Sequence, residues 1–121
     1  AIPATGTTYL AFRNYWNFQS WTFSYEGGVV EYATSTSGPW TDLGSLFVFN
    51  GYNGTVLTGV SNPLGGQSAF VGTSYGFSVS KADLSSLAGD TIYLRFRMGS
   101  NNGTDTFDGW VIDDVRVYQC V

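Results

Sequence analysis

The residues of this chain that could do chemistry are carboxylates and aromatic rings. The chain has 121 residues, with nine Asp and Glu, five Lys and Arg and no His, for a net charge of −4. The absence of His removes the commonest general base and the commonest transition-metal ligand. The lone cysteine, Cys120, excludes a Cys-rich zinc site and a disulfide within the chain. Binding of a hard metal ion and stacking on aromatic rings remain as the candidate chemistries.

Asp113 carries the sharpest of these signals. Residues 110–118 alternate with a period of two, so that Val111, Asp113, Val115 and Val117 share one face. The valines predict that this face is buried, which would point Asp113 into the core. An unpaired buried carboxylate is too costly to keep, so it must be protonated, paired, hydrogen-bonded or bound to a metal. The alternative is that Asp113 lies at a bulge or strand end and accepts backbone N–H bonds.

The metal that suits such a site is calcium. Ca²⁺ takes about six to eight oxygen ligands from carboxylates, carbonyls and water. Oxygen donors that could join Asp113 are Asn14, Gln19, Glu26, Asp105 and Asp108. The oxygen-rich segment 99–108 lacks the spacing and the distal Glu of an EF-hand loop. The residues alone leave open which of these donors would join Asp113.

Catalysis is the other use of a carboxylate pair. A glycosidase needs two Asp or Glu residues flanking a cleft, and Glu26 with Glu31, or Asp105 with Asp108, could be imagined in that role. Nothing in the sequence fixes their separation. A serine nucleophile would lack its usual histidine base. We therefore expect that this chain is not an enzyme.

The aromatic residues divide into a predicted core and a predicted ligand surface. The chain has 4 Trp, 8 Tyr and 9 Phe, and a sandwich of this size needs many of them for its core. The core candidates are Phe12, Phe18, Phe47, Phe96 and Trp110. The candidates for ligand binding are Trp21, Tyr25, Tyr52 and Tyr75, because Tyr and Trp offer a large contact area at low entropic cost. Tyr52 could equally be a turn residue that packs back onto the sheet.

The elements that must position these side chains are strands. No segment shows sustained helical periodicity, whereas alternation recurs between Gly, Asn, Ser and Pro residues. In residues 9–18 the apolar face contains one polar exception, Asn14. One helical turn is predicted in residues 81–88, capped by Ser80 or Asp83 and ended by Gly89. Strands are expected at residues 9–18, 29–33, 46–49, 55–58, 69–71, 77–79, 92–98 and 110–118.

This pattern predicts an all-β fold. Eight or nine short strands at regular spacing are typical of an antiparallel β-sandwich or jelly roll. The length predicts a single domain over residues 1–121. The start Ala1-Ile2-Pro3 suggests the boundary of a processed or excised domain.

Composition also limits the partners. The few charges and many aromatic residues argue against disorder. No apolar run approaches the roughly 18 residues of a membrane span. The acidity of the chain and the lack of a basic cluster argue against nucleic acid as a partner.

A set of short motifs covers nearly the whole chain. They include Tyr25-Glu26-Gly27-Gly28-Val29-Val30, Trp40-Thr41-Asp42-Leu43-Gly44, Asn50-Gly51-Tyr52-Asn53-Gly54, Asn62-Pro63-Leu64-Gly65-Gly66 and Gly109-Trp110-Val111-Ile112-Asp113-Asp114. Together they resemble the jelly-roll accessory domain of secreted bacterial peptidases. These peptidases include fungalysin-like and immune-inhibitor-A-like metallopeptidases and subtilases, and the accessory domain is a distant relative of the MAM domain.

The resemblance implies a secreted, non-catalytic, calcium-stabilised module. Asp113 would be a calcium ligand, and Glu26 and Gln19 stand where the family more often carries Asp and Glu. With this resemblance, the predicted ligand set is Asp113, Glu26, Gln19 and Asn14. The module would target a catalytic domain of the same polypeptide to polysaccharide or insoluble extracellular protein. The alternative is a structural, maturation or adhesion domain that contacts only protein and has no glycan ligand.

Overall fold

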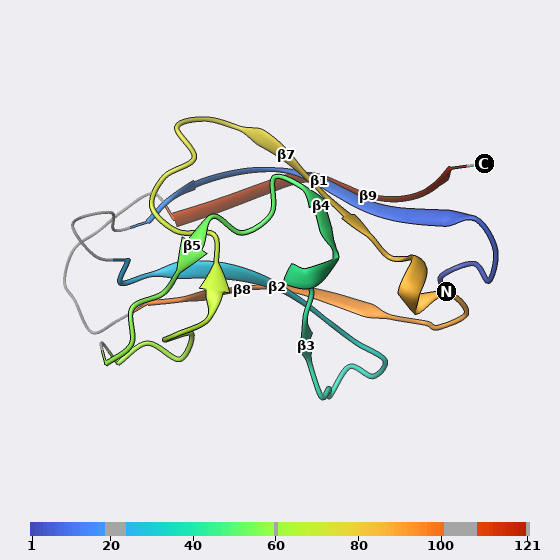
Figure 1. Ribbon diagram of the computed structural model, residues 1–121, viewed down its shortest axis with the longest axis horizontal. Helices are drawn as coiled ribbons and strands as arrows, with labels where there is room; N and C mark the ends of the chain where they lie inside the picture. The colour runs from blue at the N-terminus through green and yellow to red at the C-terminus, as the bar shows by residue number, and fades with distance from the viewer. Residues whose placement is uncertain (19–23, 60, 101–108, 121) are drawn as a thin grey trace.

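The chain folds as an antiparallel β-sandwich (Figure 1), which confirms the predicted fold class. The computed structural model describes residues 1–18, 24–59, 61–100 and 109–120. Its strands are β1 (Thr7–Asn17), β2 (Gly27–Ala33), β3 (Thr41–Asp42), β4 (Phe47–Phe49), β5 (Gly54–Thr55), β6 (Ser68–Ala69), β7 (Ser78–Asp83), β8 (Tyr93–Gly99) and β9 (Gly109–Cys120). Two 3₁₀ turns, η1 (Gly44–Leu46) and η2 (Ser85–Leu87), complete the elements of the described ranges. No helix within these ranges has the length and apolar character needed to cross a membrane.

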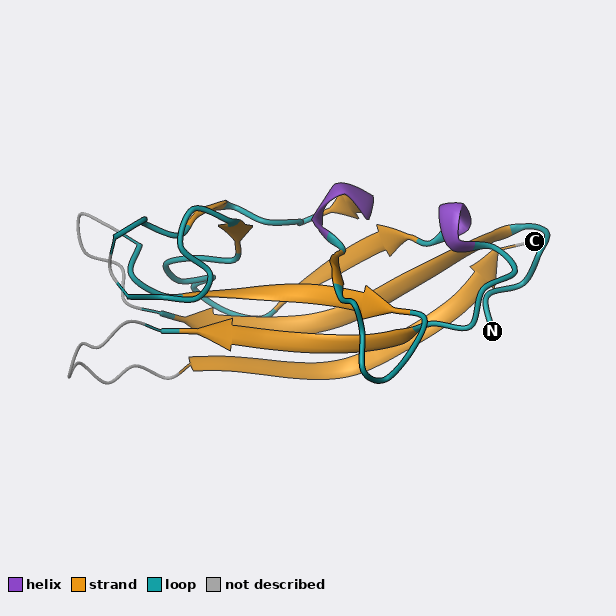
Figure 2. Cartoon of the chain, turned by 90° about the horizontal axis from the view of Figure 1, so that it is seen from below, coloured by secondary structure: helices purple, strands orange, loops and turns teal. Residues whose placement is uncertain are grey.

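The strands form two main layers. One sheet has the order β4-β7-β1-β9, and the other has the order β3-β2-β8. The short pair β5-β6 joins the second layer through reciprocal backbone hydrogen bonds between Gly28 and Phe70, at 3.0 and 2.9 Å. Figure 2 shows the long strands running together along the long axis, with the two helical turns as short coils beside them.

The core lies between the layers, and the inner face of β1 supplies much of it. Leu10, Phe12, Trp16 and Phe18 are buried, as their alternation predicts. Asn14 shares this face and is fully buried. The indole N–H of Trp16 donates to the carbonyl of Val71 at 2.9 Å. Burying these large side chains is the main favourable contribution to folding.

The predicted helical turn is present, but it is shorter than residues 81–88. Strand β7 continues to Asp83, and only Ser85–Leu87 forms a 3₁₀ turn. An Asp83 carboxylate oxygen accepts a hydrogen bond from the Ser85 amide at 2.9 Å. Gly89 follows with φ +87°, which favours glycine.

The predicted orientation of the last strand is wrong. Ile112 lies opposite the fully buried Asn14, so the core face of β9 begins with Trp110 and Ile112 rather than with Val111 and Asp113. The physical reason is a β-bulge that an alternation pattern cannot reveal. Three steps on β9, from Asp113 to Arg116, span only two steps on β1, from Arg13 to Ala11.

The bulge reverses which residues of β9 face the core. Asp114 has φ 53°, the left-handed conformation that Asp tolerates better than most residues. Beyond it Val117 lies opposite the buried Leu10, on the core side. The valines therefore lie on both faces of β9, and Val111, Val115 and Val117 are all exposed.

The two sides of the sandwich differ. On one side, residues 41–56 connect the short edge strands β3 and β4 to β5. We call this the closed side. On the other side lie the long edge strands β8 and β9, each at the end of its sheet. We call the side with β8 and β9 the open side.

Candidate functional site

The structure does not bring the predicted calcium ligands together. Asp113 lies opposite Arg13 and is exposed, whereas Asn14, the next residue along β1, points into the core. These two donors therefore lie on opposite faces of one sheet. A carboxylate oxygen of Asp113 accepts the Asp114 amide at 2.8 Å, at the bulge. The expectation of a buried Asp113 is wrong, and the alternative of a carboxylate that accepts a backbone N–H at a bulge is the arrangement found.

The other predicted ligands give no metal cage either. Glu26 is half-buried in the segment before β2, and Gln19, Asp105 and Asp108 lie outside the described residues. Within the described ranges, no group of three or more His, Cys, Asp or Glu side chains could hold a metal ion. Asn14 has a buried amide nitrogen with no hydrogen-bond partner, and its oxygen accepts from Ser80 at 3.4 Å. Calcium binding stays a prediction from the resemblance.

The predicted ligand aromatics have different environments. Trp21 lies outside the described residues, and Tyr25 is half-buried. Tyr75 is 93% exposed and has φ 57°, at the tip of a turn. Tyr52 packs against Phe47 and Phe70, with ring centroids 5.3 and 5.1 Å away. Tyr52 is thus a turn residue packed back onto the core, which was the alternative for it.

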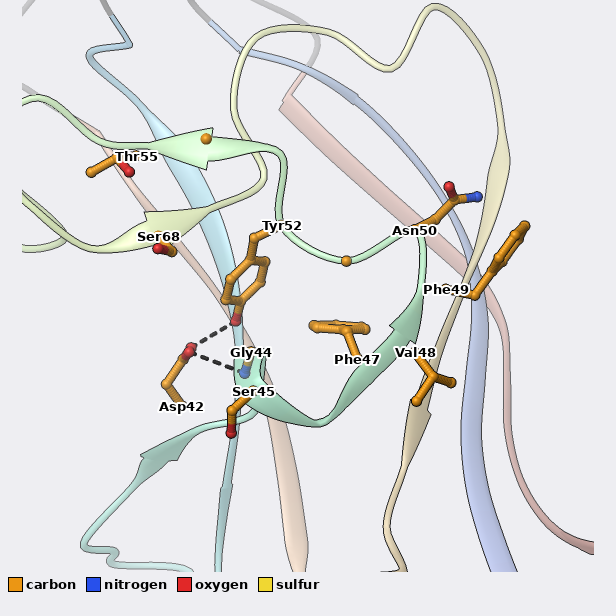
Figure 3. A pocket seen from close by; sticks show the side chains of 12 residues that line it. Asp42, Gly44, Ser45, Phe47, Val48, Phe49, Asn50, Tyr52, Thr55 and Ser68 are labelled. Carbon is orange, nitrogen blue, oxygen red and sulfur yellow. Dashed lines mark hydrogen bonds between the residues drawn. The ribbon is translucent and has the colours of Figure 1, made fainter.

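Tyr52 also forms a wall of a groove on the closed side (Figure 3). The groove has a volume of about 780 Å³ and lies between η1, β4 and the β5-β6 pair. Its aromatic part is formed by Phe47 and Tyr52, whereas the ring of Phe49, which also borders the groove, points away from them in Figure 3. The remaining lining residues are Asp42, Gly44, Ser45, Val48, Asn50, Gly51, Gly54, Thr55 and Ser68.

Hydrogen bonds fix the Tyr52 ring in this wall. Its hydroxyl lies 2.6 Å from an Asp42 carboxylate oxygen, to which it donates, and it accepts the Val30 amide at 2.8 Å. Asp42 also accepts the Gly44 amide at 3.0 Å, as the dashed lines in Figure 3 show. Burial and the hydrogen bond to Asp42 raise the pKa of Tyr52 above its ordinary value. The phenol therefore stays protonated and remains a donor to Asp42.

Two glycines allow the chain to lie close to these rings. A Cβ on Gly44 would lie 2.5 Å from the Tyr52 ring and 2.7 Å from the Asp42 carboxylate. A Cβ on Gly51 would lie 2.7 Å from the Cβ of Phe47. Larger residues at these positions would push the rings out of place.

The rim of the groove is polar. Ser45, Thr55 and Ser68 present exposed hydroxyl-bearing side chains, and Asp42 presents an exposed carboxylate. The Asn50 amide donates to the carbonyl of Val79 at 2.9 Å, which holds the end of β4 against β7. Aromatic faces beside hydroxyl groups and a carboxylate can bind a ligand that has both apolar faces and many hydroxyls.

Sequence reasoning identified only Tyr52 among these groove residues. Asp42, Ser45, Thr55 and Ser68 were not predicted as site residues, and Phe47 was assigned to the core. The motif Trp40-Thr41-Asp42-Leu43-Gly44 is part of the family resemblance and was the one available signal for Asp42. The groove lining comes from segments whose strands have only two or three residues, which is too short for a periodic pattern.

Of the carboxylates that might have served catalysis, Glu31 is held in an ion pair, and Asp105 and Asp108 lie outside the described residues. The side chain of Glu31 is 8% exposed and pairs with Arg95 at 2.6 Å and Arg97 at 3.7 Å. Arg95 in turn lies over the Trp40 ring, 4.3 Å from its centroid. This cluster clamps β2 to β8 and places Glu31 between two cations, which suits a structural ion pair.

Comparison with protein-family models, with curated proteins and with solved structures found no match to this chain.

Proposed function

We propose that this chain is a non-catalytic binding module that holds a secreted enzyme on a polysaccharide, with the closed-side groove as its ligand site. The observation that supports this most is the groove lining. It combines the Phe47 and Tyr52 rings with the hydroxyl groups of Ser45, Thr55 and Ser68 and the carboxylate of Asp42. Sugars have apolar ring faces that stack on aromatic side chains and hydroxyls that exchange hydrogen bonds.

The groove also favours a neutral glycan over an acidic one. Among the described residues, its lining contains one carboxylate, Asp42, and no Lys or Arg. A uronic acid or sulfate group would be repelled by Asp42 and would find no cation to pair with. The open shape of the groove suits a segment of a chain polymer, which can enter and leave along its length.

The remaining parts of the proposal come from the family resemblance. Secretion, a catalytic domain in the same polypeptide and stabilisation by calcium are expected of such accessory domains. The competing role is an adhesion or maturation domain that contacts only protein.

Retention on insoluble polymers tests the proposal. The chain is mixed with cellulose, chitin, xylan and, in a separate arm, fibrillar collagen, and the unbound fraction is measured. We expect retention on at least one glycan and no retention on collagen. Retention on collagen alone would support the protein-only role in place of glycan binding. No retention on any of the glycans or on collagen would contradict both proposed roles.

A matched pair of variants locates the site. Ser45 and Ser86 are the exposed middle residues of η1 and η2, and only Ser45 lines the groove, so neither truncation should disturb the core. We expect Ser45→Ala to weaken glycan binding by about 2- to 10-fold, the value of one hydrogen bond. Ser86→Ala should leave binding unchanged. The reverse result would move the ligand site away from the groove.

A further inference from the structure

The free edge of β9 is the longest unpaired strand edge in the described part of the chain. Strand β9 has 12 residues and pairs with β1 along one side only. The edge strands of the closed side, β3 and β4, have only two and three residues. A long edge presents a row of unpaired N–H and C=O groups, which is a template for another strand.

The apolar residues of this edge lack cover. Strand β8 reaches the beginning of β9, where the Phe96 and Trp110 rings lie 5.7 Å apart. Further along, Val117 faces the core side opposite Leu10 and is still 50% exposed, and Val115 is 49% exposed. The core cluster includes Trp110 and Ile112 but neither of these valines.

We propose that two copies of this chain associate through antiparallel pairing of their β9 strands. In this arrangement Asp113 of each copy lies opposite Arg116 of the other. The same register places Val111 opposite Tyr118 on the outer face and Ile112 opposite Val117 on the core face. The two four-stranded sheets then continue into one another across a two-fold axis, so that each contact occurs twice.

Charge complementarity selects this register. The bulge places Asp113 and Arg116 on one face of β9, because they lie opposite Arg13 and Ala11 of β1. No ion pair is found for Arg116 within the described ranges, whereas Asp114 pairs with Arg13 at 3.7 Å.

Other registers are less favourable. Sliding one β9 strand along the other by two residues changes the partner of Asp113. In one direction Asp113 lies opposite Asp114 of the other copy, and in the other direction it lies opposite Tyr118. Opposite charges across a strand pair stabilise it, and like charges destabilise it. The register that pairs Asp113 with Arg116 also places the bulge of one β9 strand opposite the bulge of the other. Outward-facing residues then lie opposite outward-facing residues, and core-facing residues opposite core-facing residues, before and after the bulge.

Charge reversal tests the pairing directly. Sedimentation equilibrium over a range of concentrations should show a wild-type dimer. Asp113→Arg and Arg116→Asp each place like charges at both symmetric contacts, and each should weaken association by about tenfold or more. An equimolar mixture of the two variants has opposite charges at both contacts and should recover the wild-type association. Asp90→Arg changes an exposed charge away from β9 and should have no effect.

Several results would overturn the proposal. A wild-type chain that stays monomeric at every concentration contradicts it, as does a mixture that associates no better than either variant alone. Circular dichroism reports whether Asp113→Arg still folds. If it does not fold, Val117→Lys replaces it, because this half-exposed position tolerates a lysine in the monomer. An undiminished dimer of Val117→Lys would then place the interface elsewhere. Retention on glycan is scored separately, so this test and that of the groove can fail independently.

Discussion

The closed and open sides of the sandwich differ in how they end their sheets, where backbone N–H and C=O groups are left unpaired. On the closed side, β3 and β4 are short, and residues 41–56 cross between the sheets and are tied down by the Tyr52 and Asp42 hydrogen bonds. On the open side, β8 and β9 are long, and Met98, Val115 and Val117 are about half exposed. The difference shows that closing an edge with irregular chain creates a groove, whereas leaving it as a strand creates a surface for pairing.

The two sides should also differ in what a truncation costs. Phe70 is fully buried beneath the closed side and has Trp16 and Tyr52 ring centroids within about 5 Å. We expect Phe70→Ala to lower the free energy of unfolding by about 3–5 kcal/mol. Val117→Ala on the open side should cost less than about 1 kcal/mol. Urea denaturation at low protein concentration, where association does not contribute, measures both.

Equal losses at these two positions would contradict the comparison. They would mean that Val117 is buried in the monomer, or that the structure around Phe70 relaxes to fill the cavity that Phe70→Ala creates.

The hydrogen bonds of the Tyr52 hydroxyl are expected to make the main polar contribution to the stability of the closed side. Tyr52→Phe removes the bond to Asp42 and leaves the Val30 amide without its acceptor. Each lost hydrogen bond costs about 1 kcal/mol, so the expected loss of stability is about 1–3 kcal/mol. Tyr75→Phe is the matched control, because Tyr75 is 93% exposed and its hydroxyl should contribute nothing measurable. A comparable loss of stability in both variants would show that the Tyr52 hydroxyl makes no special contribution to the fold.

Tyr52 should also give the fold a dependence on alkaline pH. Its pKa is raised above the ordinary value of 10.0 in the folded chain, first by burial and then by the hydrogen bond to Asp42. The stabilisation is complete below pH 10 and is lost as the pH rises above it, because the unfolded chain then releases the phenol proton while the folded chain keeps it. Denaturation of wild type and Tyr52→Phe at about pH 8 and pH 11 should show the difference between them shrinking. A difference that grows with pH would contradict this sign.

The smallest effect is expected at the bulge of β9. Asp114→Asn keeps a residue that tolerates the left-handed backbone and removes only an ion pair whose side chains are half exposed, so stability should change by less than about 0.5 kcal/mol. Asp114→Val places a β-branched residue at φ 53° and should cost about 1–2 kcal/mol. Thermal unfolding of the two variants distinguishes a true bulge from a regular strand, in which valine would be the better residue.

The sequence predicted the fold where alternation is uninterrupted. The buried face of β1, including the polar exception Asn14, follows directly from residues 9–18. The orientation of β9 could not be predicted in this way, because one extra residue at Asp114 exchanges its faces and an aspartate carries no signature of a bulge. An edge strand also lacks the sharp contrast between buried and exposed positions that makes alternation informative.

The candidate site was less predictable than the fold. Its lining residues lie between Asp42 and Ser68, and only the packing of η1, β4, β5 and β6 brings them together. Tyr52 was identified because a tyrosine offers a large contact area, and its position between two Asn-Gly pairs supported the alternative of a turn residue packed onto the sheet. Asp42 becomes meaningful only once its carboxylate is seen to hold the hydroxyl of Tyr52.

The proposal that the closed-side groove is the ligand site is tested most directly by mapping the ligand on the folded chain. Uniformly ¹⁵N-labelled protein is titrated with soluble oligosaccharides cut from the glycan that retains it, and amide chemical shifts are followed by NMR. Saturable shifts at Asp42, Ser45, Thr55 and Ser68, with none at Tyr75 or along β9, are the predicted result. Shifts confined to Tyr75, Phe77 or β9, or no saturable shift at any residue, would contradict it.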